Sequence, residues 1–193
     1  MIIVFDTETT GLPKNWNAPV TDTENWPRMI QIAWVIYDKT GKQLEAKDYI
    51  IRPEGFNIPK DAEQIHGIST ERALFEGHDL YIVLKEFLDA VERCDYLVAH
   101  NISFDEKIVG AEIIRTKIKY ARNPNIQRIC TKEASTDYCK LPGPYGYKWP
   151  SLAELHRKLF GNDFKEAHQA EVDVQATGKC FWELVRLGVI ELD

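Results

Sequence analysis

The chain opens with the stretch IIVFDTETTG at residues 2–11, in which an apolar run leads directly into two acids. The four apolar, β-prone residues at its start predict a buried strand. Side chains alternate between the two faces of a strand, so Asp6 and Glu8 project from one face while Thr7 points to the other. Two carboxylates at roughly 4 Å repel each other by about 4 kcal/mol at an effective dielectric constant near 20. A divalent cation is the simplest partner that offsets this repulsion.

Length and composition indicate one soluble globular domain. The 193 residues are 44% hydrophobic and 28% charged, which is ordinary for such a protein. We therefore expect a single domain at residues 1–193, long enough for a substantial core. The net charge of −6 counts against a protein that coats nucleic acid, but it allows an enzyme that captures phosphate through metal ions.

Targeting signals are missing from the sequence. No apolar run approaches the ~18 residues of a membrane span, and the N-terminus lacks the basic-then-apolar pattern of a secretory signal. The four cysteines have neither a C-x-x-C pair nor a zinc-ligand spacing, so we expect reduced thiols. These features favour a cytoplasmic protein without membrane contact.

The apolar periodicities alternate between strands and helices along the chain. Strands are expected at residues 2–5, 29–37, 47–52, 96–99 and 126–130. Helices are expected at residues 59–67, 80–91, 103–117, 152–160 and 171–187. Ser151 and Glu154 have the spacing of a capping box for the fourth of these helices. The order predicts a mainly α/β fold with the first strand at its centre.

Two further motifs contain acids near expected helix starts. In HNISFDE at residues 100–106, Ser103 and Glu106 have the spacing of a capping box, which places Asp105 in the first helical turn. An acid there commonly does no more than complement the helix dipole. In HQAEVD at residues 168–173, a lone histidine is more often structural than catalytic. Taken alone, neither motif is evidence for catalysis.

In combination, these motifs resemble the DEDDh branch of the DEDD 3′-to-5′ exonucleases, a superfamily that includes the proofreading epsilon subunit of bacterial DNA polymerase III. The resemblance is carried by FDTETTGL at residues 5–12, by His100, Asn101, Phe104 and Asp105, and by His168 with Asp173 five positions later. A sister branch has a tyrosine four positions before the last aspartate. That residue is Gln169 here, which rules the tyrosine branch out.

The resemblance implies a ribonuclease H-like fold, with a five-stranded mixed sheet flanked by helices on both faces. It implies that His168 is the general base and that two divalent ions, Mg²⁺ or Mn²⁺, are held by four acids. These implied catalytic acids and metal ligands are Asp6, Glu8, Asp105 and Asp173. The implied contacts to the 3′-terminal nucleotide are Thr7, Thr9, Leu12, Ile65, His66 and Asn101. For Asn101, a role in the strand-to-helix turn is slightly favoured over nucleotide contact.

Elementary chemistry is consistent with these implied roles. Hydrolysis of a phosphodiester needs a deprotonated water in line with the leaving 3′ oxygen, and two metal ions about 4 Å apart meet this need. Such hard ions prefer carboxylate and water oxygens. A histidine with an ordinary pKa near 6.5 accepts a proton near neutral pH. The expected hydrolase removes nucleoside 5′-monophosphates from a 3′ end.

The sequence leaves the natural substrate open. We expect DNA 3′ ends, single-stranded rather than paired, and the alternatives are RNA or a non-catalytic nucleic-acid-binding module. DTETT at residues 6–10 weakly echoes the D-x-D-x-T motif of haloacid dehalogenase-like phosphatases, but its second acid is Glu8. We expect no polymerase-binding tail, because the chain ends shortly after its last helix. The oligomeric state and the role of the loop at residues 13–27 stay undecided.

One stretch of this acidic chain is locally positive. Residues 115–132 contain six basic residues and no acid. This stretch either steers a phosphate backbone or forms a solvated loop.

Overall fold

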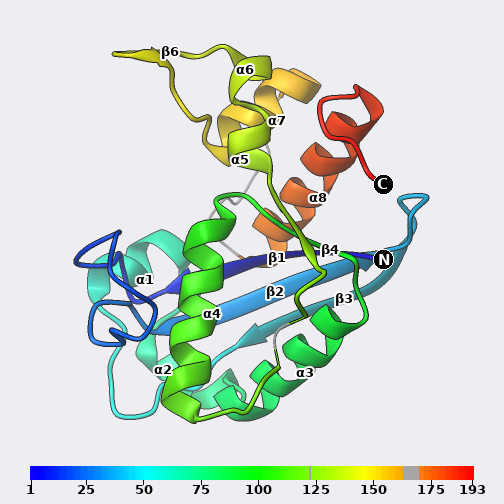
Figure 1. Cartoon of the computed structure of the whole chain (residues 1–193). Coiled ribbons are helices and arrows are strands. Elements are labelled where there is room, and N and C mark those ends of the chain that lie inside the picture. The colour runs from blue at the N-terminus through cyan, green and yellow to red at the C-terminus, as the bar shows by residue number, and fades with distance from the viewer. Residues whose placement is uncertain (122, 163–169) are drawn as a thin grey trace.

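The computed structural model describes residues 1–121, 123–162 and 170–193, and Figure 1 shows the whole chain. The main sheet contains β1 (Ile2–Thr9), β2 (Met29–Tyr37), β3 (Gln43–Ile50), β4 (Tyr96–Ala99) and β5 (Gln127–Cys130). The helices are α1 (Lys60–His66), α2 (Thr70–Glu76), α3 (Leu80–Glu92), α4 (Ile102–Thr116), α5 (Thr131–Ala134), α6 (Thr136–Cys139), α7 (Leu152–Phe160) and α8 (Ala170–Arg186). A separate hairpin consists of β6 (Pro142–Gly143) and β7 (Gly146–Tyr147).

The main sheet is mixed, with the strand order β3-β2-β1-β4-β5. β1 pairs antiparallel with β2 and parallel with β4, and β4 pairs parallel with β5. This topology confirms the expected five-stranded mixed sheet with the first strand at its centre. Within the described part of the chain, no helix has the length and apolar character needed to cross a membrane.

The alternation of side chains along β1 divides the interior into two cores. Ile3 and Phe5 pack in a cluster that also contains the buried side chains of α3 and α4. Ile2 and Val4 pack on the opposite face, in a cluster with the buried side chains of α8. Figure 1 shows α4 crossing in front of the sheet. Each face of the central strand is therefore covered by a different helix.

Several short elements were not predicted from the sequence. α2, α5, α6 and the β6–β7 hairpin are each too short to produce a clear apolar period. The third strand was predicted at residues 47–52, but β3 begins at Gln43 and ends at Ile50. It is an edge strand with one face open to solvent. Its first residues therefore alternate between polar and apolar and do not form an apolar run.

One of the two predicted capping boxes is wrong. α4 begins at Ile102, directly after Asn101, which has a left-handed backbone with φ 82°. Ser103 therefore lies inside the helix, and the Glu106 carboxylate instead pairs with Arg128 at 2.6 Å. Asp105 is nevertheless in the first turn, as predicted. The capping box of α7 at residues 151–154 is confirmed.

The loop at residues 13–27 packs against α4. Trp26 is buried, and its indole N–H donates to the Pro19 carbonyl at 3.1 Å. Lys107 of α4 donates to the Trp16 carbonyl at 2.9 Å, and the Trp16 ring lies 5.7 Å from the ring of Phe104. The long connection after β1 is thus fixed to the helix that carries Asp105.

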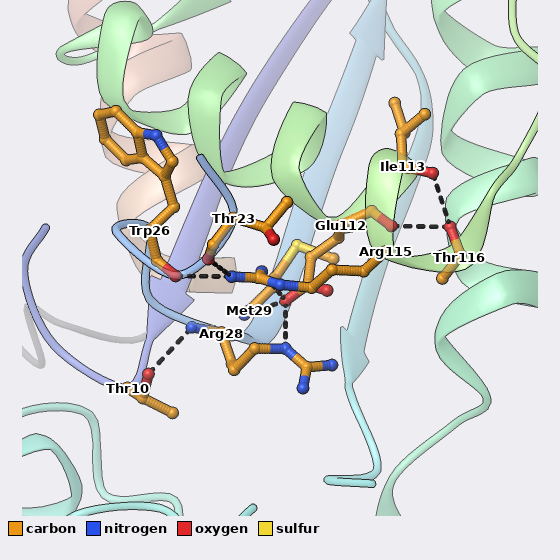
Figure 2. A network of polar contacts seen from close by, with 9 residues as sticks. All are labelled: Thr10, Thr23, Trp26, Arg28, Met29, Glu112, Ile113, Arg115 and Thr116. Carbon is orange, nitrogen blue, oxygen red and sulfur yellow. Dashed lines mark hydrogen bonds and ion pairs between the residues drawn. The ribbon is translucent and has the colours of Figure 1, made fainter. Parts of the chain in front are cut away.

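A buried carboxylate joins this loop, α4 and the start of β2 (Figure 2). The side chain of Glu112 is fully buried in α4. Its Oε1 accepts hydrogen bonds from Arg28 Nε at 2.9 Å and from the Met29 amide at 3.0 Å. The same oxygen pairs with Arg115 Nη1 at 2.9 Å, and Arg115 also donates to the Trp26 carbonyl at 2.6 Å.

Arg28 connects this network to the turn that follows β1. Its amide donates to Thr10 Oγ1 at 2.9 Å, and its carbonyl accepts from the Thr10 amide at 2.9 Å. Its guanidinium also lies 4.3 Å from the centre of the Phe56 ring. The turn after the two acids of β1 is therefore held to α4 through Arg28 and Glu112 (Figure 2).

Neutralising Glu112 would leave two guanidinium groups without their buried counter-charge. We expect Glu112→Gln to lower the free energy of unfolding by about 3 kcal/mol, as when one partner of a buried ion pair is removed. Urea unfolding, followed by tryptophan fluorescence, measures this loss.

The matched control is Glu183→Gln. Glu183 pairs with Arg186 at the same i,i+3 spacing as Glu112 and Arg115, but Arg186 is largely exposed. Loss of this surface pair should cost less than about 1 kcal/mol. If both variants lost the same free energy of unfolding, burial would not be what makes the Glu112 network stabilising.

Candidate active site

Three carboxylates meet between the end of β1 and the first turn of α8. Asp6 and Glu8 continue the face of β1 that packs against α8, because every second side chain of a strand shares a face. Asp173 lies in the first turn of α8. One oxygen of each of these carboxylates lies within 4.8 Å of the other two. The fold thus brings acids from opposite ends of the chain together, as the metal-site prediction requires.

Asp105 approaches the same strand from the α4 side. It is buried, and its Oδ1 accepts hydrogen bonds from the Thr7 amide at 3.1 Å and from Thr7 Oγ1 at 2.7 Å. β4 pairs with β1 only as far as Val4, which leaves the Thr7 amide available for this bond. Thr7, predicted to contact the nucleotide, therefore also positions Asp105.

Burial and mutual repulsion raise the pKa values of these acids. Burial, and then the charges of the other three acids, raise the pKa of Asp6 well above its ordinary value. Burial, followed by the charges of Asp173 and Asp105, raises the pKa of Glu8 to about 8. Burial also raises the pKa of Asp105, although its hydrogen bonds from Thr7 act in the opposite direction. Without a cation, the cluster therefore retains protons near neutral pH.

Gln31 of β2 holds the start of α8 and was not found from the sequence. It is the cross-strand neighbour of Glu8 and is buried. Its Oε1 accepts a hydrogen bond from the Ala170 amide at 3.2 Å, three residues before Asp173. The first amides of a helix have no acceptor within the helix, so Gln31 satisfies one of them. This role depends on the register of β1 against β2, which has no local signal in the sequence.

The end of β1 carries two of the residues predicted to contact the nucleotide. Thr9 is buried, and its hydroxyl donates to the Gly11 carbonyl at 2.7 Å. Gly11 has φ 145°, in the region that favours glycine. The next residue, Leu12, exposes most of its side chain. A tight turn thus presents an apolar side chain directly after the acidic strand.

The end of α1 carries two more residues predicted to contact the nucleotide, Ile65 and His66. Ile65 is exposed, whereas His66 is buried and its Nδ1 accepts a hydrogen bond from the Ile68 amide at 3.1 Å. Burial lowers the pKa of His66, so the ring is neutral near pH 7. Gly67 follows in the left-handed conformation with φ 73° and caps α1 at the residue where the helix expected at residues 59–67 ends.

Asn101 lies in the turn between β4 and α4. Its left-handed backbone suits asparagine better than most residues. Its side chain makes no cap to the helix; instead its Oδ1 accepts a hydrogen bond from Lys132 Nζ at 2.6 Å. Lys132 is the last residue of the basic stretch, but it is 31 residues from Asn101 in the sequence, and no local pattern indicates this contact.

The rest of the basic stretch at residues 115–132 is divided between different roles. Arg115 belongs to the Glu112 network, and Arg128 pairs with Glu106. Lys117 ends α4 in a left-handed conformation and is exposed. Arg122 lies outside the described residues, as do His168 and Gln169.

A cavity of about 830 Å³ lies between α7, α8 and the turn joining β2 to β3. Its lining includes Gly41, His156, Phe160 and Trp182. None of the predicted site residues within the described ranges lines it, so it is separate from the acidic cluster.

The chain is similar to known nucleases along nearly its whole length. The sequence model of the exonuclease family matches residues 3–181. The 3′-5′ exonuclease DinG of Bacillus subtilis is 31% identical over 184 residues, which are 95% of this chain but 17% of DinG. A PolC-type DNA polymerase III of Listeria innocua is 28% identical over 95% of this chain and 11% of its own length. The chain thus spans less than a fifth of these curated relatives.

Solved structures of exonuclease I share the fold. Escherichia coli exonuclease I in complex with a dT13 oligonucleotide has a TM-score of 0.74 at 19% identity, covering 96% of this chain and 40% of that one. Exonuclease I of Methylocaldum szegediense has a TM-score of 0.73 at 22% identity, with the same coverage. With the family match over residues 3–181, these results establish that the chain belongs to the exonuclease family and has the ribonuclease H-like fold that its DEDDh motifs predicted.

Proposed function

We propose that residues 1–193 form one metal-dependent 3′-to-5′ exonuclease domain that hydrolyses phosphodiester bonds at the 3′ end of single-stranded DNA and releases nucleoside 5′-monophosphates. The observation that carries this proposal is the convergence of Asp6, Glu8 and Asp173, with Asp105 beside them. Membership of the exonuclease family supports the reaction class. The oligonucleotide bound to exonuclease I supports single-stranded DNA as the substrate.

The donor set of the cluster fits hard divalent cations. All its ligand atoms are carboxylate oxygens, which Mg²⁺ and Mn²⁺ prefer over nitrogen or sulfur. We propose that Asp6, Glu8, Asp105 and Asp173 hold two such ions. When bound, the ions supply the Lewis acidity that lowers the pKa of a water and stabilises the departing 3′ oxygen. Burial, and then repulsion from Asp173 and Asp105, raises the pKa of Glu8, and bound cations would offset this destabilisation of its charged form.

The chain's own groups then position the substrate and move the proton. We propose His168 as the general base that takes a proton from the attacking water, since its motif position matches that of the DEDDh histidine. Thr7 and Thr9 lie on the strand that carries the acids, where their backbone is held in register by β2. Leu12 and Ile65 expose apolar side chains suited to packing on the terminal base. We propose further nucleotide contacts from His66, the last residue of α1, and from Asn101, which directly precedes α4.

A degradation assay tests this function directly. The protein is incubated with 5′-labelled single-stranded DNA, or with the matching RNA, in Mg²⁺ or in chelator. We expect a ladder that shortens from the 3′ end of DNA in Mg²⁺ alone, and slower cleavage when the 3′ end carries a phosphate. Asp6→Ala should lower the rate by more than about 100-fold, because it removes a metal ligand.

The matched control is Asp89→Ala, which removes an exposed acid of α3 and should leave the ladder unchanged. A ladder on RNA alone would identify an exoribonuclease. Binding of DNA without cleavage in Mg²⁺ or Mn²⁺ would identify a non-catalytic module instead.

Metal binding should depend on pH in a direction set by the raised pKa values. A carboxyl whose pKa is higher in the folded state stabilises the fold at low pH, and this stabilisation is lost as the pH rises through the folded value. In chelator we therefore expect Tm to fall between pH 5 and pH 8, since the pKa of Glu8 moves from 4.5 to about 8. Saturating Mn²⁺ should raise Tm by about 5–10 °C at pH 8 and by much less at pH 5.

Glu8→Gln separates repulsion from metal binding in the same thermal scans. In chelator at pH 8 this variant should be more stable than wild type, because one buried negative charge is gone. Its stabilisation by Mn²⁺ should be lost. Glu92→Gln, at an exposed acid of α3, should behave as wild type in both respects. Equal stabilisation by Mn²⁺ at pH 5 and pH 8 would speak against ligation by these acids.

Replacement of His168 should affect chemistry rather than metal binding. We expect His168→Gln to lower kcat by about 10²–10⁴-fold, the usual contribution of a general base, while the Mn²⁺ concentration for half-maximal stabilisation changes less than about threefold. His78→Gln is the control, since His78 is exposed. Equal losses of kcat and metal affinity would assign His168 to the metal site.

A further inference from the structure

Exposed aromatic side chains lie on and beside the β6–β7 hairpin, outside the candidate active site. Tyr145 at the hairpin tip is fully exposed, and Tyr147 and Trp149 expose 52% and 60% of their surface. Figure 1 shows the hairpin extending away from α5, α6 and α7 at the top of the view. Three aromatic rings left in solvent within a stretch of five residues form a candidate binding surface.

The backbone that presents these rings is well ordered by local contacts. β6 and β7 pair tightly, so that a side chain at Gly143 would lie 3.1 Å from the Gly146 carbonyl. The Lys148 amide donates to the Leu141 carbonyl at 2.9 Å, and Lys148 Nζ pairs with Glu154 at 2.5 Å. A hairpin backbone held in this way loses less conformational entropy on ligand binding than an unpaired loop would.

The base of the hairpin is attached to the turn before α4. Lys132 Nζ lies 4.2 Å from the centre of the Trp149 ring and donates to Asn101 Oδ1 at 2.6 Å. The imidazole of His100 lies between Thr131 Oγ1 and the Pro150 carbonyl, at 3.0 and 3.1 Å. The aromatic surface therefore continues, through Lys132, to the helix turn that carries the buried acid of α4.

Lys132 supplies a positive charge at this junction. Among the described residues its polar and ring contacts are an amide oxygen and an indole, neither of which carries a negative charge. This charge lies close to the acidic cluster, since Asn101, the partner of Lys132, directly precedes α4, whose first turn carries Asp105. An ammonium group without a carboxylate partner, beside a phosphodiester-cleaving site, suits a backbone phosphate.

The chemistry of this surface suits single-stranded nucleic acid rather than a duplex. Bases of a single strand expose the flat faces that stack on aromatic rings, and lysines bind the intervening phosphates. Bases inside a duplex are stacked on each other and do not offer these faces. A single strand whose 3′ end occupies the acidic cluster must leave it across a neighbouring surface, and the hairpin surface begins at Asn101.

We propose that Lys132, Trp149, Tyr147 and Tyr145 form a stacking platform for the unpaired nucleotides on the 5′ side of the scissile bond. The platform rests on the proposed exonuclease function and extends it from the terminal nucleotide to the upstream strand. Lys132 binds a backbone phosphate, Trp149 stacks on a base next to the site, and the two tyrosines hold bases farther along the strand.

Substrates of different length test the platform. The two substrates are the oligonucleotide dT20 and the p-nitrophenyl ester of thymidine 5′-monophosphate, which contains only the terminal nucleotide. We expect Trp149→Ala to raise KM for dT20 by about tenfold, as for loss of one stacked base, with less than a twofold change for the ester. The double variant Tyr145→Ala, Tyr147→Ala should behave in the same way, and Trp149→Phe should restore most of the affinity. Lys132→Gln should reduce the slope of log KM against log salt by about 1.

The control variants are Tyr81→Ala and Lys85→Gln on α3, because Tyr81 is as exposed as Tyr147 and Lys85 is also exposed. An unchanged KM for dT20 in the hairpin variants would overturn the platform, as would equal changes for dT20 and the ester. Failure of the wild type to cleave either substrate would refute the proposed function alone. In that case the dissociation constant of labelled dT20 in chelator still tests the platform, because loss of the rings should weaken binding about tenfold.

Discussion

The repulsion among acids at the end of β1 is the constraint on which the rest of this structure depends. Folding partly buries Asp6 and Glu8 and then adds the partly buried Asp173 from one side and the buried Asp105 from the other. Burial and this crowding raise the pKa values of Asp6 and Glu8, so the arrangement disfavours the charged forms of these acids. The site is therefore built at the expense of stability, as is common where a protein prepares a place for positive charge.

The scaffold withstands this repulsion because three different elements hold the acids: β1 carries Asp6 and Glu8, α4 carries Asp105 and α8 carries Asp173. The Thr7 amide and hydroxyl hold Asp105, and Gln31 holds the start of the helix that carries Asp173. The turn after the acidic strand is bonded to Arg28, which Glu112 anchors to α4 (Figure 2). Polar groups around the acids thus position them, in part through backbone amides, those of Thr7 and Ala170, that have no partner within the sheet or the helix.

Catalysis and strand binding place opposite demands on the surface. The acids must be crowded and shielded from solvent, Asp105 fully and the other three in part, whereas rings that stack on bases must remain exposed. In this chain the two requirements are met by different segments, the centre of the main sheet and the short β6–β7 hairpin. Lys132 and Asn101 lie where the two segments meet.

The sequence by itself determined the features that depend on neighbours within a few residues. These include the shared face of Asp6 and Glu8, the first-turn position of Asp105, the end of a helix at residue 67 and the long periodic helices. Family resemblance, rather than pattern, linked Asp173 to the other acids. Tertiary structure alone decided the contacts made by Gln31, Glu112 and Lys132, because these depend on strand register and on helices packing across the sheet. Tertiary structure also decided where α4 begins. The turn at Asn101 starts the helix at Ile102, so Ser103 lies within the helix and does not cap it.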